Sequence, residues 1–232
     1  MDYAEMSDIL KSTLGLESEP VGVVLFKSEE DIPKDLKEIE KPMPYCGMVQ
    51  RARRGEVLFA RLDKHDCKGG ASGIGLVECP ENISTGKLYF SKLNKSATQT
   101  VGQRIASSMP RLPAGSTAAT LVAPLAKLNM DPDVVIFVGN ALQARRIVQA
   151  VMYRRGGRMN FDTAGIQSFC VDATASPILK GDVNVSLGCD GSAKKSALSE
   201  NDVVVGIPFE MLEDICRVLK ERHEGWDKFM RS

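Results

Sequence analysis

The chain has 232 residues, of which 43% are apolar and 26% charged, a composition that excludes collagen, a coiled coil and wholesale disorder. Thirty basic and thirty acidic residues give a formal net charge of zero, which argues against general nucleic-acid binding because such proteins carry a basic surface. With no long apolar run and no basic, apolar leader, we expect a cytoplasmic protein, no membrane association, and a small molecule or a redox protein as partner.

The first quarter of the chain predicts helices and strands in alternation. Apolar residues at helical spacing predict a helix over 3–14, and Gly15 follows as a stop signal. The apolar, β-branched run 21–26 predicts a buried strand. A second helix is expected over 45–55 and a second strand over 57–62.

The middle of the chain contains its most irregular segment. Residues 63–75 hold four glycines within seven positions, which predicts a loop that opens a short helix at most. Helical spacing returns over 98–109, and the runs 117–125 and 133–139 predict strands.

A helix rich in arginine follows the strand 133–139. Its 3.6-residue period predicts one apolar face that is buried, and we expect Arg145 and Arg146 to be exposed. The expected buried face comprises Leu142, Ile147, Val148 and Val151.

Two further strands, over 183–188 and 203–208, and a terminal helix complete the pattern. Because most of the strands are apolar throughout, the sheet should be covered on both faces. We therefore predict an α/β or α+β fold, with residues 1–232 forming a single domain around a largely covered mixed sheet with flanking helices. The oligomeric state stays open.

Six cysteines in a reducing compartment are free thiols, metal ligands or catalytic groups before they are disulfides. Cys46 lies at an expected helix N-terminus, where the helix dipole should ionise its thiol easily. Cys67 lies beside His65 and Lys68, and we expect His65 to be a solvated loop residue unless it binds metal or acts as a base.

Glycines accompany two of these thiols. Gly69 and Gly70 follow Cys67, and Gly188 and Gly191 flank Cys189. Glycine lets the backbone approach a bulky group closely, so we predict that these four glycines contribute to a cofactor site.

The spacing of the cysteines leaves several interpretations open. Cys170 suits a core position as well as a site, Cys79 suits an ordinary loop, and Cys216 suits the packed face of the last helix. Four thiolates can hold zinc or an iron–sulfur cluster, but the chain has no C-x-x-C motif. Buried thiols without a function and a nucleophilic cysteine remain alternatives.

Five segments in order resemble the uncharacterised ArCR family (domain of unknown function 169), found largely in archaea and anaerobic bacteria. They are KPMPYCGMVQRARRGE, DCKGGASGIGL, PDVVIFVGNALQARRIVQA, SFCVDATASPILKGDVNVSLGCDGS and NDVVVGIPFEMLEDI.

The resemblance covers about residues 21–219 and implies which cysteines matter, because four of them fall on positions where the family has cysteine. These are Cys46, Cys67, Cys170 and Cys189. Where many relatives have a further cysteine and an arginine, this chain has Ser192 and Ala193. A cluster that relies on that extra thiol would need another ligand here.

Three functions are therefore in competition. The first is an iron–sulfur protein in which the four cysteines converge on a cluster, with 4Fe–4S as the expected type and zinc as the weaker alternative. The second is a thiol-dependent enzyme acting on a small anionic substrate, with Cys46 or Cys67 as the nucleophile. The third is a small-ligand or protein-interaction module whose thiols only pack.

Overall fold

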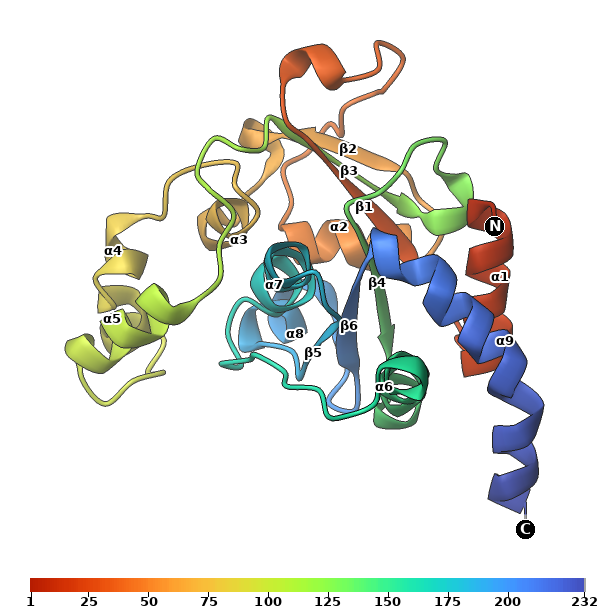
Figure 1. The fold of residues 1–232 in the computed structure, drawn as a ribbon. Helices are drawn as coiled ribbons and strands as arrows, with labels where there is room; N and C mark the ends of the chain where they lie inside the picture. The colour runs from red at the N-terminus through yellow and green to blue at the C-terminus, as the bar shows by residue number, and fades with distance from the viewer. Residues whose placement is uncertain (232) are drawn as a thin grey trace.

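The six strands of the computed structural model, which describes residues 1–231, form one antiparallel sheet in the order β2-β3-β1-β4-β6-β5 (Figure 1). All six runs that the sequence predicts as strands belong to it, so a mixed α/β fold is confirmed. The strands are β1 (Val21–Phe26), β2 (Leu58–Arg61), β3 (Ala119–Pro124), β4 (Val134–Gly139), β5 (Asn184–Ser186) and β6 (Val203–Pro208).

The ladders between these strands are antiparallel, and parallel pairing is confined to two isolated bridges, Glu38 with Phe59 and Met43 with His65. Strand β1 is buried along its whole length and lies between β3 and β4. Its residues alternate between two cores, with Val24 in one and Val23 in the other, because successive side chains of a strand point to opposite faces.

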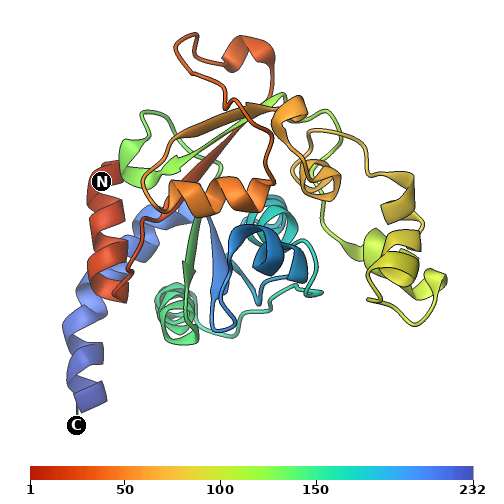
Figure 2. The same cartoon turned by 180° about the vertical axis from the view of Figure 1, so that it is seen from behind.

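One face of the sheet is covered by α1 (Tyr3–Leu14), α6 (Ala141–Arg155) and α9 (Phe209–Arg231). Helix α1 ends, as predicted, at Gly15, which adopts the left-handed conformation with φ +67°. Figures 1 and 2 show α1 and α9 side by side, so the first and last helices pack together on this face.

The predicted face of α6 is partly wrong. Ile147 and Val151 are buried together with Ala144 and Ala150, but Leu142 is 41% exposed and Val148 is half-buried. Leu142 lies five positions before Ile147, which places the two residues about 140° apart around a helix with 3.6 residues per turn. Arg146, expected to be exposed, is half-buried and donates a hydrogen bond to the carbonyl of Thr13 at 2.7 Å.

Shorter helices cover the opposite face and extend beyond it. Those against the sheet include the eight-residue π-helix η5, whose residues are all buried. Figure 1 shows α4 and α5 in a lobe that stands out from the body, away from α1 and α9. The elements are α2 (Tyr45–Ala52), α3 (Lys68–Gly73), α4 (Glu81–Ser84), η3 (Leu88–Lys92), α5 (Gln99–Ser108), η5 (Ser168–Ala175), α7 (Ser176–Lys180) and α8 (Asp190–Ser196).

Several connections between the layers contain a short helical turn. Three single-turn 3₁₀ helices, η1 (Glu29–Asp31), η2 (Leu62–Lys64) and η4 (Leu125–Lys127), lie in the links. The π-helix η5 packs tightly on β6, because a Cβ added to Gly206 would lie 2.1 Å from the carbonyl oxygen of Ala173. Glycine at this position therefore sets how closely η5, and Cys170 within it, approaches the sheet.

Candidate functional site: a cavity lined by four thiols

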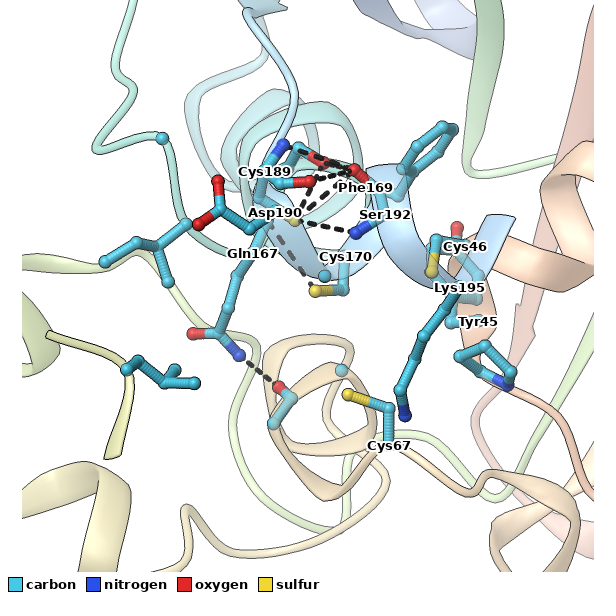
Figure 3. A pocket seen from close by; sticks show the side chains of 18 of the residues that line it. Tyr45, Cys46, Cys67, Gln167, Phe169, Cys170, Cys189, Asp190, Ser192 and Lys195 are labelled. Atoms are coloured by element: carbon cyan, nitrogen blue, oxygen red, sulfur yellow. Dashed lines mark hydrogen bonds between the residues drawn. The ribbon is translucent and has the colours of Figure 1, made fainter. Parts of the chain in front are cut away.

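A cavity of about 250 Å³ lies between the second helical layer and the protruding lobe, and Cys46, Cys67, Cys170 and Cys189 all line it. Figure 3 shows the four side chains approaching it from different sides. The structure thus brings together four cysteines that the sequence singled out, although they come from four separate segments. Cys79 and Cys216 are not among its lining residues.

Local structure places three of these thiols at helix starts. Cys46 is the second residue of α2, after Pro44 at the N-cap, and Cys67 and Cys189 are the N-caps of α3 and α8. Cys170 lies within the π-helix η5, and π-helical turns are frequent at functional sites.

Three of the four predicted glycines line the cavity, namely Gly69, Gly70 and Gly191. A Cβ added to Gly70 would lie 3.7 Å from the sulfur of Cys67 and 3.9 Å from that of Cys170, and one on Gly191 would lie 3.8 Å from the sulfur of Cys189. These glycines therefore keep open the space that the sulfurs face.

Gly188 is not among the lining residues and has a structural reason to be glycine. Its φ is +88°, a conformation that other residues rarely adopt, and an added Cβ would lie 2.7 Å from the side chain of Leu198.

Among the cysteines with a shifted pKa, Cys189 has the thiol that ionises most easily. Burial opposes its ionisation, but hydrogen bonds from Ser168 and Ser192 outweigh burial and lower the pKa of this thiol. The Ser168 hydroxyl and the Ser192 backbone N–H each donate to its sulfur at 3.4 Å. Hydrogen bonds to a thiolate stabilise the charged form.

The expectation that Cys46 ionises easily is wrong. Burial raises the pKa of Cys46 to about 11, and a helix N-terminus does not compensate for this loss of water. Burial also raises the pKa of Cys170, and negative charge on Cys67, Cys189 or Cys46 raises it further. Because negative charge on neighbouring thiols also opposes the ionisation of Cys46, four thiolates together require a positively charged group among them.

The neighbours of Cys67 also differ from expectation. His65 is buried rather than solvated, with its Nε2 3.1 Å from the hydroxyl of Thr120 and no partner for Nδ1. Burial lowers the pKa of His65 to about 4. Neither His65 nor the exposed Lys68 is among the lining residues, so neither is placed to serve the cavity directly.

Sequence reasoning missed several lining residues. Gln167 adopts the left-handed conformation with φ +58°, and its side-chain amide donates to the carbonyl of Gly69 while Arg111 donates to its oxygen at 3.2 Å. Lys195 lines the cavity beside the thiols. No local sequence pattern predicts that Gln167 or Lys195 lines a cavity, although Lys195 is only six positions after Cys189.

The protruding lobe supplies an apolar wall. Ile83, Leu88, Tyr89 and Leu93 line the cavity from α4 and η3, and Tyr89 is almost completely buried. An apolar cavity of about 150 Å³ can accept benzene, so the present cavity has room for a group larger than one ring.

Among residues 1–231, no group of three or more His, Cys, Asp or Glu side chains is arranged to hold a metal ion. Two sulfurs bound to one zinc lie at most about 4.6 Å apart, because each Zn–S bond is about 2.3 Å. A single zinc ion therefore does not fit the thiols as they stand. A cluster spreads its ligands over several iron atoms and does not require sulfurs so close together.

In the part of the chain that the structure describes, no helix has the length and apolar character needed to cross a membrane.

Comparison with known proteins finds relatives without an established activity. A protein of Methanocaldococcus jannaschii, described as uncharacterised, is 36% identical over an alignment of length 231 that covers 97% of this chain and 98% of that protein. No solved structure matches the chain. The family described as uncharacterised ArCR (domain of unknown function 169) matches residues 9–218, and the chain therefore belongs to this family.

Proposed function

We propose that the protein binds an iron–sulfur cluster, of the 4Fe–4S type, in the cavity lined by Cys46, Cys67, Cys170 and Cys189. The observation that carries the proposal is the convergence of these four thiols, from four separate segments, on one cavity. Packing alone does not require four thiols around an open space, whereas ligation of a cluster does.

Each part of the cavity has a role in this proposal. Cys189, with its lowered pKa, offers the first thiolate, and Cys46 and Cys170 give up their protons only as positive charge arrives. Gly70 and Gly191 leave room between the sulfurs, and the apolar wall limits the access of water. When bound, the cluster supplies one-electron chemistry.

Four protein thiols leave no iron atom without a protein ligand, which favours electron transfer over direct binding of a substrate to iron. The partner is then a redox protein, or a small molecule held at the mouth of the cavity. We assign this activity to an anaerobic cytoplasm, where thiols stay reduced and clusters escape oxidation.

The test is anaerobic purification, followed by reconstitution with iron and sulfide. We expect visible absorption, iron and acid-labile sulfide in wild type, and loss of all three in Cys67→Ala and Cys189→Ala. Cys79→Ala and Cys216→Ala serve as matched controls and keep the cluster, because neither residue lines the cavity. A folded wild-type protein that takes up neither iron nor sulfide would overturn the proposal.

A thiol-dependent enzyme is the second candidate, and one observation favours it. The lowered pKa of Cys189 in a cavity makes this residue, rather than Cys46, the candidate nucleophile. In the metal-free protein, iodoacetamide followed by mass spectrometry should label Cys189 before Cys46. Equal labelling would remove the support for this candidate.

A further inference from the structure

Lys195 brings a positive charge into the cavity that the four thiols line. It lies on α8, six residues after Cys189, and lines the cavity together with polar residues such as Gln167 and the oppositely charged Lys95 and Asp190. Figure 3 shows its side chain running past Cys46 and ending toward Cys67. Its ammonium nitrogen lies 3.7 Å from a carboxylate oxygen of Asp66, the residue before Cys67.

The other charges that line the cavity largely cancel. Lys95 forms an ion pair with Asp190, and both residues line the cavity. The pair between Lys195 and Asp66 is long, and both side chains are more than 40% exposed, so it holds the lysine only weakly. Lys195 is therefore the lining cation that is available to the thiols.

A cluster with four thiolate ligands is an anion, and reduction adds one further negative charge. A positive charge nearby stabilises the reduced form more than the oxidised form. Resting on the proposed function, we propose that Lys195 is a positioning residue that raises the reduction potential of the cluster by directing its ammonium group toward Cys67.

Two substitutions test this proposal with opposite signs. Lys195→Gln removes the positive charge and is expected to lower the potential, whereas Asp66→Asn removes the negative charge that offsets Lys195 and is expected to raise it. Lys195→Arg keeps the charge and should stay near the wild-type value. General damage to the fold does not produce shifts in opposite directions.

Lys194→Gln is the matched control, since Lys194 lies on the same helix, is exposed and is not among the lining residues. The measurement is an anaerobic potentiometric titration with dithionite as the one-electron donor, followed by visible absorption and electron paramagnetic resonance. Iron and sulfide are determined for each variant, which separates cluster loss from a change of potential.

The outcomes distinguish this proposal from the one on which it rests. Wild type without iron and sulfide would overturn the proposed function itself. A loaded wild type whose potential is unchanged in both Lys195→Gln and Asp66→Asn, or one that shifts equally in Lys194→Gln, would overturn the role of Lys195 and leave cluster binding in place.

Discussion

Gly70 shows how a single missing side chain can serve a site. It lies in α3, where alanine is more favourable than glycine by up to about 1 kcal/mol, and an added Cβ would make ordinary contacts with Cys67 and Cys170. Gly70→Ala should therefore raise the urea midpoint of the metal-free protein and lower the iron bound per chain, because its methyl group occupies the space between the two sulfurs.

Gly225→Ala is the control for this prediction. Gly225 lies in α9, and an added Cβ meets nothing within 4 Å, so the variant should gain stability without losing iron. Full iron loading of Gly70→Ala would show that the cluster does not fill the space between Cys67 and Cys170.

His65 gives the molecule a stability that depends on pH. Its pKa is lowered by burial from 6.5 to about 4, so the unfolded chain binds the proton more readily. Its contribution is fully present above pH 6.5 and is lost as the pH falls toward 4, by on the order of 3 kcal/mol.

We expect His65→Gln, measured by urea unfolding of the metal-free protein, to flatten the loss of stability between pH 6.5 and 4. An unchanged slope in His65→Gln would mean that other groups cause the acid destabilisation.

At the scale of one element, α6 shows how a sequence pattern can mislead. Ile147 is completely buried, whereas Leu142, which the same pattern places on the apolar face, is 41% exposed. Ile147→Ala should destabilise the protein by about 2–5 kcal/mol, and Leu142→Ala by about 0.5 kcal/mol or less. Urea unfolding measures both, and similar losses would contradict the observed orientation of α6.

Short elements are where prediction from the sequence reached its limit. Apolar, β-branched runs correctly predict strands such as β4 and β6, because a strand that is buried on both faces needs apolar side chains along its whole length. The π-helix η5 and the left-handed Gln167 leave no comparable pattern. The burial that raises the pKa of Cys46 comes from segments distant in the chain. Its position at a helix start therefore predicted a pKa shift in the wrong direction.

At the scale of the whole molecule, the site links segments that the sheet alone does not hold together. If a cluster binds all four thiols, it binds the native state and not the unfolded chain, and it therefore raises the unfolding temperature. Reconstituted wild type should melt at a higher temperature than the metal-free protein. Reconstitution should leave the melting temperature of Cys170→Ala unchanged, and equal rises in both proteins would contradict four-cysteine ligation.

Strand β1 lies in the middle of the sheet, yet its partners β3 and β4 begin at Ala119 and Val134. During synthesis, β1 therefore cannot pair with β3 or β4 until about a hundred further residues have been made. Cys46 and Cys67 emerge from the ribosome early, while Cys170 and Cys189 emerge late. The nascent chain thus presents these two thiols of the site, unprotected, to any oxidant until the later segments are made, and a cluster bound by all four thiols could be inserted only after Cys189 has been synthesised.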